Sequence, residues 1–273
     1  ISQHAGCSSF LVQTPFIENA TQITWIFGDD SNDSNTQMVS HVYSNESNNT
    51  QIFTISAIGV SEYGCVGEYS SFINVNPQPI AQFMTDISEG CSPFVVTILD
   101  NSTQADLYWS YGDGVNAFGF NGEMHQYSFQ NPGEETITRE VSLTAIGDGG
   151  CVDTQSIEFD IFPEVISQFS TTPESCSPFN TTFTNESSEN QTYSWEFGDG
   201  VISEEENPTH IFTNPSSIED ANYLVTLTVT SEMGCSDVST EMISALATPA
   251  ANISLSQSIG CGSFYSIAEA QGG

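Results

Sequence analysis

One six-residue pattern, an aromatic pair followed by an aspartate turn, occurs three times and constrains the fold of this chain more than any other feature. It reads WIFGDD at residues 25–30, WSYGDG at residues 109–114 and WEFGDG at residues 195–200. The three tryptophans of the protein lie in these copies, 84 and 86 residues apart. A pattern that returns at such a regular period predicts a tandem array of similar small domains.

Each copy of the pattern predicts a strand that enters a tight turn. Trp and the aromatic residue two positions later lie on one face of an extended strand. Gly114 and Gly200 supply the positive φ that a tight turn needs, and we expect Asp30 to adopt it in the first copy. A His-x-aromatic segment follows each tryptophan by 16, 16 and 15 residues and is expected to form the returning strand; its histidines are His41, His125 and His210.

These residues resemble the signature of the PKD (polycystic kidney disease) domain, W-D-F-G-D-G followed by N-P-x-H-x-Y. The third copy, which continues with NPTHIF at residues 207–212, matches nearly throughout. The second copy lacks the Asn-Pro before His125, and the first has Asp30 where the turn glycine belongs. The resemblance covers roughly residues 1–249 and implies immunoglobulin-like β-sandwiches of about seven strands each.

The repeat period divides the chain into four segments. PKD-like repeat 1 occupies residues 1–79 and lacks its first strand, repeat 2 occupies residues 80–164, repeat 3 occupies residues 165–249, and residues 250–273 begin a fourth repeat. Alternating apolar residues, as in residues 223–230, predict half-buried strands, and no long segment has a helical period. We therefore expect an all-β protein of tandem sandwiches arranged end to end, cut from a longer array.

The charge balance excludes several classes of partner. The chain has no lysine, one arginine (Arg139) and 35 acidic residues, for a net charge of −34. Nucleic acids and anionic lipid surfaces both require cationic side chains, so we expect neither as a partner. No apolar run is long enough to insert into a membrane. Screening should relieve the self-repulsion, so we expect stability to rise with ionic strength and with millimolar Ca²⁺.

Six of the seven cysteines are spaced as one pair per repeat, with separations of 58, 60 and 59 residues. The economical interpretation is a disulfide within each repeat and therefore an oxidising, extracellular setting. A zinc site would need clustered cysteines, which the sequence lacks. Cys261 resembles the first cysteine of a fourth repeat. The expected pairs are Cys7–Cys65, Cys91–Cys151 and Cys176–Cys235.

The motif aspartates Asp29, Asp113 and Asp199 invite a metal or a catalytic interpretation. A carboxylate beside a turn usually accepts backbone N–H bonds instead, and we favour that structural role. Calcium is the alternative, because hard cations require several oxygen ligands at once, although the spacing matches no EF-hand. Apart from Ca²⁺, no cofactor is predicted. The candidate calcium ligands are Asp29, Asp30, Asp33, Glu204, Glu205 and Glu206.

The histidines of the motif, one per repeat, cannot form a metal cluster within a repeat. We expect His41, His125 and His210 to be buried structural imidazoles bonded to the backbone. The sequence has no nucleophile elbow, zinc-protease motif or phosphate-binding glycine loop. The prediction is that the protein is not an enzyme.

The Gly-Cys-Ser-Pro-Phe segment at residues 90–94 extends the resemblance to the giant surface adhesins of gliding bacteria, which are exported by the type IX secretion route. That resemblance implies a structural or adhesive stalk at the cell surface, used in adhesion and motility. Short proline-bearing junctions, such as residues 76–79, favour a stiff rod. The implied partners are other repeats of the same long chain and surface glycans or cell-surface proteins.

Two alternatives remain open. The first is an accessory PKD array of a secreted hydrolase that assists polysaccharide or protein binding, which exposed aromatic residues would favour. The aromatic residues are expected at core-facing positions instead. The second is a filament subunit in which residues 251–273 supply the strand that repeat 1 of the next subunit lacks.

Overall fold

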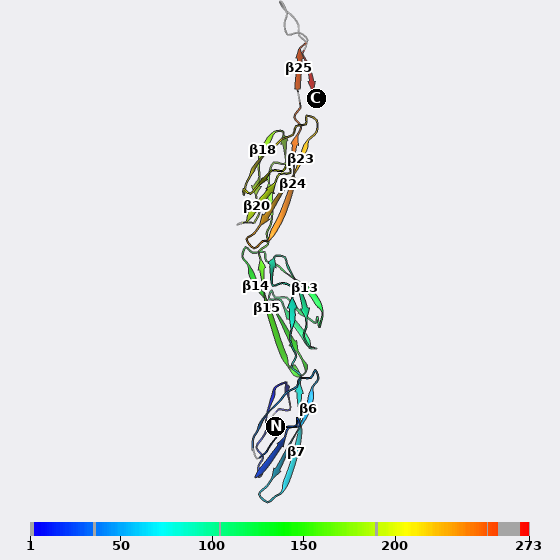
Figure 1. Ribbon diagram of the computed structural model, residues 1–273, viewed down its shortest axis with the longest axis vertical. Coiled ribbons are helices and arrows are strands. Elements are labelled where there is room, and N and C mark those ends of the chain that lie inside the picture. The colour runs from blue at the N-terminus through cyan, green and yellow to red at the C-terminus, as the bar shows by residue number, and fades with distance from the viewer. Residues whose placement is uncertain are drawn as a thin grey trace, which may run out of the picture. The chain divides into compact units, whose positions relative to one another are not determined.

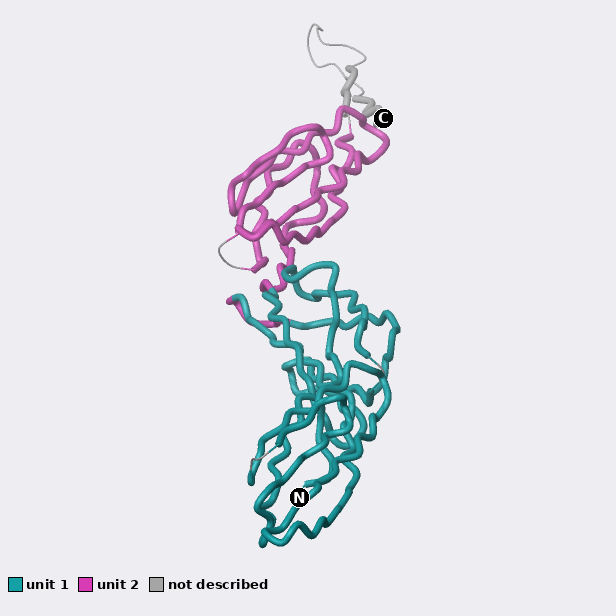
Figure 2. Tube along the Cα trace, turned by 60° about the horizontal axis from the view of Figure 1, so that its bottom comes forward, with its two compact units in different colours: residues 1–130, 136–161 teal, residues 131–135, 162–273 magenta. Residues whose placement is uncertain are grey.

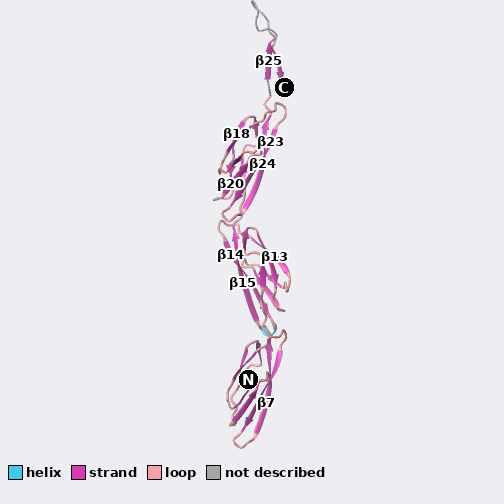
Figure 3. Ribbon diagram, viewed as in Figure 1, coloured by secondary structure: helices cyan, strands magenta, loops and turns pink. Residues whose placement is uncertain are grey.

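The computed structural model describes residues 3–34, 37–103, 105–188, 191–249, 251–255 and 268–272, with backbone alone for the last two ranges. These residues form immunoglobulin-like β-sandwiches, as predicted, and their one helical element is the 3₁₀ turn η1 (Asp148–Gly150) (Figure 3). The chain divides into two compact units (Figure 2). Unit 1 comprises Ile1–Gln130 and Thr136–Ile161, and unit 2 comprises Asn131–Glu135 and Phe162–Gly273.

Repeat 1 is a sandwich of two sheets within unit 1 (Figure 1). The larger sheet has the order β1-β7-β6-β3-β4, formed by β1 (Ala5–Cys7), β7 (Val66–Asn76), β6 (Gln51–Val60), β3 (Gln22–Ile26) and β4 (Asn32–Ser34). The smaller sheet pairs β2 (Phe10–Gln13) with β5 (Ser40–Tyr43). The core between the two sheets includes Val12, Ile23, Trp25, Tyr43, Ile55 and Ile73.

Repeat 2 has the same plan, with one more strand in its smaller sheet. The larger sheet has the order β12-β11-β14-β15-β9, formed by β12 (Asn116–Phe118), β11 (Asp106–Ser110), β14 (Ile137–Ile146), β15 (Val152–Phe162) and β9 (Glu89–Cys91). The smaller sheet has the order β13-β10-β8, formed by β13 (Met124–Phe129), β10 (Phe94–Asp100) and β8 (Phe83–Thr85). The core includes Phe83, Val96, Trp109, Phe129, Leu143 and Phe159.

Repeat 3 lies in unit 2 and repeats the larger sheet. Its order is β17-β24-β23-β20-β21, formed by β17 (Glu174–Cys176), β24 (Ser236–Leu246), β23 (Ala221–Thr230), β20 (Thr192–Glu196) and β21 (Ile202–Ser203). The other layer consists of β18 (Phe179–Thr182) with β22 (Thr209–Phe212), and β16 (Phe169–Ser170) with β19 (Thr184–Asn185). The core includes Phe183, Trp195, Phe197, Phe212, Val225 and Leu227. After this repeat, β25 (Ala251–Leu255) pairs with β26 (Ala268–Gly272).

The motif tryptophans lie on the second strand from one edge of each larger sheet, with side chains that face the core. Trp25, Trp109 and Trp195 are 3%, 1% and 0% exposed. The hairpin that follows each tryptophan is closed by the short strands β4, β12 and β21. The histidine-bearing segments form strands, as expected, although not beside the tryptophan strands. They belong to the opposite sheet and pair with β2, β10 and β18.

The first position of each motif turn requires glycine for a steric reason. Gly112 has a φ of 74°, and a Cβ there would lie 2.6 Å from the carbonyl oxygen of Glu140 on β14. Gly28 meets Thr54 on β6 in the same way. A side chain at either position would therefore collide with backbone that cannot move without disrupting the sheet. At the end of the first turn, Asp30 has a φ of 67°, the left-handed conformation expected for it.

The described part of the chain contains no helix with the length and hydrophobicity that a membrane crossing requires.

Candidate functional site

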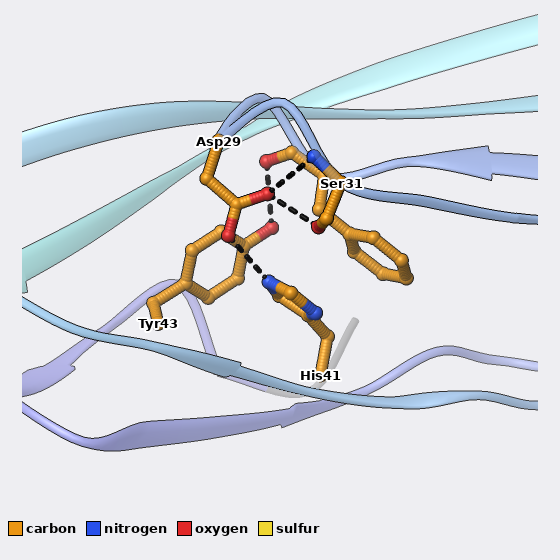
Figure 4. Close-up of polar contacts among 5 residues, drawn as sticks. Asp29, Ser31, His41 and Tyr43 are labelled. Carbon is orange, nitrogen blue, oxygen red and sulfur yellow. Dashed lines mark hydrogen bonds and ion pairs between the residues drawn. The ribbon is translucent and has the colours of Figure 1, made fainter.

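The turn of repeat 1 brings the motif aspartate and histidine together from opposite sheets (Figure 4). Oδ1 of Asp29 accepts hydrogen bonds from the backbone N–H of Ser31, at 3.1 Å, and from its hydroxyl. Oδ2 of Asp29 lies 2.7 Å from Nε2 of His41, which belongs to β5. The ring of Phe27 stacks on His41 at 4.0 Å, and the Tyr43 hydroxyl donates to the Phe27 carbonyl at 2.9 Å. The aspartate thus connects the two layers of the sandwich.

Hydrogen bonding sets the proton affinities in this turn. Burial acts to raise the pKa of Asp29, but the bonds from Ser31 and His41 outweigh it and hold that pKa below its usual value. Burial, followed by the charge of Asp29, raises the pKa of Tyr43 to about 12. The aspartate is therefore a stable anion and the tyrosine a stable donor near neutral pH.

Repeat 3 builds the same arrangement. Oδ1 of Asp199 accepts the backbone N–H of Val201 at 3.0 Å, and Oδ2 lies 2.8 Å from Nε2 of His210. The ring of Phe197 stacks on His210 at 4.2 Å. Burial acts to raise the pKa of Asp199, but the bonds from Val201 and His210 lower it overall.

Repeat 2 places a tyrosine where the other repeats have the histidine. The Tyr127 hydroxyl donates to Oδ2 of Asp113 at 2.6 Å, and its ring stacks on Tyr111 at 3.7 Å. Oδ1 of Asp113 accepts the backbone N–H of Val115 at 3.0 Å. Burial, and then the bond and charge of Asp113, raise the pKa of Tyr127, because its ionisation would put two negative charges together.

His125 is therefore not the counterpart of His41 and His210, contrary to the sequence interpretation. Strand register shows this, since Phe94 pairs with Phe129 where Phe10 pairs with Tyr43 in repeat 1. The residue two positions before each of these aromatics is Tyr127 in repeat 2 and His41 in repeat 1. The sequence contained a signal for this assignment. Tyr127 has an aromatic residue, Phe129, two positions after it, as His41 has Tyr43.

His125 has surroundings of its own. Its Nε2 lies 3.0 Å from the Tyr111 hydroxyl, and its ring stacks on Phe120 at 4.1 Å. Burial lowers the pKa of His125, against the attraction of Asp100. The expected bond from a motif histidine to the backbone was wrong for all three: His41 and His210 bond to carboxylates, and His125 bonds to a phenol.

A family model of the PKD domain matches residues 163–245. Residues 163–245 are a PKD domain. Repeats 1 and 2 share the turn motif and the sheet order of that segment. No curated protein matches the chain.

Solved structures resemble parts or most of the chain. The PKD1 domain of Vibrio anguillarum Epp is 23% identical, with 30% of this chain and 94% of that chain covered and a TM-score of 0.25. The I67–I69 fragment of the titin I-band is 10% identical, with 89% and 94% covered and a TM-score of 0.46. Mouse cadherin-23 EC22–24 is 13% identical, with 90% and 95% covered and a TM-score of 0.31.

In the motif turns of repeats 1 and 3, the side chains that could act in chemistry are already hydrogen-bonded to one another. Both carboxylate oxygens of Asp29 and of Asp199 are hydrogen-bonded. The Ser31 hydroxyl donates to Asp29 and so is not a nucleophile activated by His41. Among the described residues, the close pairs between a histidine and a carboxylate are His41–Asp29 and His210–Asp199.

Most of the candidate calcium ligands are exposed, and Asp33 is half-buried. Among the described residues, no group of three or more His, Cys, Asp or Glu side chains is arranged to hold a metal ion. Asp30 forms the end of the first turn, while Asp33 lies in β4 opposite Trp25. In the run of Glu204, Glu205 and Glu206, the Glu205 carbonyl accepts the indole N–H of Trp195 at 2.9 Å.

The cysteines differ from the predicted scheme. Cys7 of repeat 1 forms a disulfide with Cys151 of repeat 2, so the Cys7–Cys65 and Cys91–Cys151 pairs were wrong. Cys65 and Cys176 are exposed free thiols, which also rules out Cys176–Cys235. Cys91 and Cys235 are both disulfide-bonded. Cys261 lies outside the described residues.

Strand length explains why a disulfide within a repeat fails. Cys7 ends β1, which runs parallel to β7 and places Cys7 opposite Asn76. Cys65 immediately precedes β7, so the 11 residues of that strand separate the two cysteines. At about 3.3 Å per residue this is roughly 36 Å, whereas a disulfide requires Cα atoms about 6 Å apart. Repeat 3 separates Cys176 from Cys235 in the same way, through β24.

Proposed function

We propose that the chain is a non-catalytic stalk segment of a secreted cell-surface adhesin, in which serial PKD repeats hold a binding surface away from the cell. The observation that carries this proposal is the Cys7–Cys151 disulfide, which connects consecutive repeats instead of closing one. A cross-link between repeats adds nothing to a binding pocket or a catalytic centre. It strengthens the junction, which is the part of a serial array that bends and separates first.

The junction between repeats 1 and 2 has two covalent connections and several specific contacts. The linker residue Asn76 accepts a hydrogen bond from Thr50 at 2.8 Å and packs so closely on η1 that a Cβ on Gly149 would lie 1.9 Å from its amide nitrogen. Gln78 donates to the carbonyl of Val152 at 2.7 Å. These contacts hold the linker against both repeats, so the junction resists bending as a stalk requires.

The composition suits an extracellular spacer. A net charge of −34 keeps such a chain soluble and discourages side-by-side association of neighbouring stalks. The proposed partners are further repeats of the same long chain, with glycans or proteins of a cell surface at the binding end. The resemblance to the adhesins of gliding bacteria supplies the most specific form of this proposal, a stalk used in adhesion and motility.

The test is mechanical. In single-molecule stretching from the chain ends, an intact Cys7–Cys151 disulfide withholds a segment of 144 residues from extension. At up to about 3.6 Å per residue, reduction should add up to about 500 Å to the unfolded length. Small-angle scattering of the oxidised chain should show an extended particle. A compact particle, or repeats that unfold without measurable resistance to force, would rule out a stalk.

One observation favours a second candidate, an accessory module of a secreted hydrolase that binds polysaccharide. The expectation that aromatic residues face the core was only partly correct. Tyr108 and Phe118 form an exposed edge-to-face pair on repeat 2, with centroids 4.8 Å apart and exposures of 39% and 71%. Titration with insoluble polysaccharides tests this candidate. Retention by the wild-type chain, lost in Tyr108→Ala and Phe118→Ala but kept in Val152→Ala, would favour it over the stalk.

A further inference from the structure

Two cysteines of the described residues remain thiols, and each occupies a position whose equivalent is disulfide-bonded elsewhere in the chain. Cys65 lies in the turn between β6 and β7, as Cys151 lies between β14 and β15. Cys176 ends β17, as Cys7 ends β1. Cys7 and Cys151 are bonded to each other across the junction of repeats 1 and 2. Cys176 therefore occupies the position of Cys7 in that disulfide, and Cys65 occupies the position of Cys151.

The local structure around each free thiol reproduces that of its bonded equivalent. Around Cys176, β17 runs parallel to β24 with Cys176 opposite Leu246, as Cys7 lies opposite Asn76. The next backbone N–H also bonds in the same way, from Ser177 to Leu246 at 3.1 Å and from Ser8 to Asn76 at 2.9 Å.

The Cys65 turn matches that of Cys151 in the same detail. The carbonyl of Cys65 accepts the N–H of Ser61 at 2.9 Å, and the carbonyl of Cys151 accepts that of Gly147 at 2.8 Å. What differs is burial: Cys151 is 1% exposed beneath its partner, while Cys65 is exposed.

We propose that Cys176 forms a disulfide with the second cysteine of a PKD repeat that follows repeat 3, and Cys65 with the first cysteine of one that precedes repeat 1. This rests on the proposed stalk, because it needs a longer array of the same repeats. The rule is that the first cysteine of each repeat bonds to the second cysteine of the next. Every junction is then closed by one disulfide, and no repeat is closed on itself.

The oxidation needs an acceptor for two electrons, and a small-molecule or protein disulfide supplies it. The Cys176 thiolate attacks that disulfide, one of its sulfurs leaves as a thiolate, and a mixed disulfide forms. The cysteine of the following repeat then displaces the second sulfur. Two thiols and one disulfide become one new disulfide and two thiols, so atoms and electrons balance.

The test extends the chain by one repeat. Residues 80–164 are appended after Pro249 in place of residues 250–273, with Val152→Ile in the appended copy as a mass label. The chain is oxidised with glutathione disulfide, alkylated under native conditions and mapped without reduction. We expect Cys176 to lose its alkylation and to appear linked to the appended copy of Cys151. The original Cys7–Cys151 peptide in the same map shows that the chain has folded.

Two variants of the extended chain sharpen the result. Cys176→Ser should leave the appended Cys151 open to alkylation, while Cys65→Ser should change nothing at that junction. If Cys176 stays alkylated while the appended Cys91 and Cys151 pair with each other, the proposal is overturned. The Cys65 half is tested in a second chain, in which a copy of residues 80–164 and then a copy of residues 80–84 precede Ile1. In that chain we expect a disulfide between Cys91 of the added copy and Cys65. Alkylation of Cys65 in that chain would overturn this half.

The peptide map tests the pairing rule and the mechanical test examines the stalk, so either proposal can be contradicted without the other. A chain that forms these disulfides but scatters as a compact particle would contradict the stalk and leave the pairing rule standing. A chain that is extended but closes each repeat on itself would do the reverse.

Discussion

Repeats 1 and 2 have the same sheet order and the same motif, yet they complete that motif with different partners. In repeat 2, Phe83 of β8 packs edge-to-face on Trp109 at 5.1 Å, and the Trp109 indole donates to the carbonyl of Gly119 at 3.1 Å. In repeat 1, no strand among the described residues takes the place of β8. Beside Trp25 there remains an apolar hollow of about 210 Å³, lined by Pro15, Ile17, Trp25, Ile55, Ala57, Tyr69 and Ser71.

The edge of repeat 1 also differs in its ability to accept a strand. In repeat 2, β8 pairs with β10 so that Met84 lies opposite Leu99. The equivalent of Leu99 is Pro15, since Phe10 and Phe94 hold the same register position. Proline has no N–H to donate, so this edge resists the addition of a foreign strand. The motif therefore fixes the core of each repeat, while neighbouring segments decide how well that core is covered.

The largest expected contrast is between the two tryptophans. Trp109→Ala should destabilise repeat 2 by about 3–5 kcal/mol, because it removes a fully packed indole and its hydrogen bond. Trp25→Ala should cost roughly 1–2 kcal/mol less, because that indole already borders a hollow. Urea unfolding followed by far-ultraviolet circular dichroism measures both. Equal costs would show that the hollow beside Trp25 has no energetic consequence.

The bonded and the free cysteine of repeat 1 provide the next contrast. Cys7→Ser should lower stability by about 2–4 kcal/mol, because it removes the constraint that the Cys7–Cys151 disulfide places on the unfolded chain. Cys65→Ser, at an exposed and unbonded position, should leave stability unchanged. Calorimetry of both variants is the measurement. A loss of stability in Cys65→Ser would contradict the assignment of Cys65 as an unbonded thiol.

The aspartate turns should respond differently to loss of charge. Asp29→Asn should cost about 1–2 kcal/mol, because it weakens a charge-assisted bond to His41 that is partly exposed to solvent. The lowered pKa of Asp29 contributes stability above the unfolded value of about 3.9 that is lost as pH falls through the folded pKa. Stability measured from pH 5 to pH 2 should therefore fall less steeply in the variant. Identical slopes would show that the pair contributes nothing to acid sensitivity.

His125 gives repeat 2 a pH response of its own. Its folded pKa is lowered by burial, so the folded state binds fewer protons than the unfolded one. Stability should decrease as pH falls below about 6.5, the unfolded value, toward the folded pKa. Comparing wild type with His125→Phe between pH 7.5 and 5.5 isolates this effect, because the overall charge repulsion is common to both. A difference between the two proteins that is independent of pH would contradict it.

Salt should produce the smallest and least local effect. With a net charge of −34, a rise in NaCl concentration should raise the melting temperature of both repeats together. CaCl₂ at equal ionic strength should act alike, since the described residues contain no group arranged to bind a metal. Stabilisation by Ca²⁺ at far lower concentration, confined to one repeat, would reveal a specific site.

Features that depend on neighbouring residues could be predicted from the sequence alone. Alternation with period two placed the tryptophans in the core, and the Asp-Gly turns required the positive φ found at Gly114 and Gly200. Asp30 could replace such a glycine because its short side chain tolerates the left-handed region. The repeat period indicated the repeating units, because each unit is built mostly from contacts within some 85 residues.

Tertiary structure alone decided which distant groups meet. Equal cysteine spacing suggested pairs within repeats, but spacing does not reveal that β7 holds Cys7 and Cys65 at its opposite ends. Spacing also assigned His125 to the aspartate, whereas the pairing of β10 with β13 brings Tyr127 there. Both errors have one physical reason. A strand fixes the direction of its side chains locally, while its register and its two ends are set by the strands beside it.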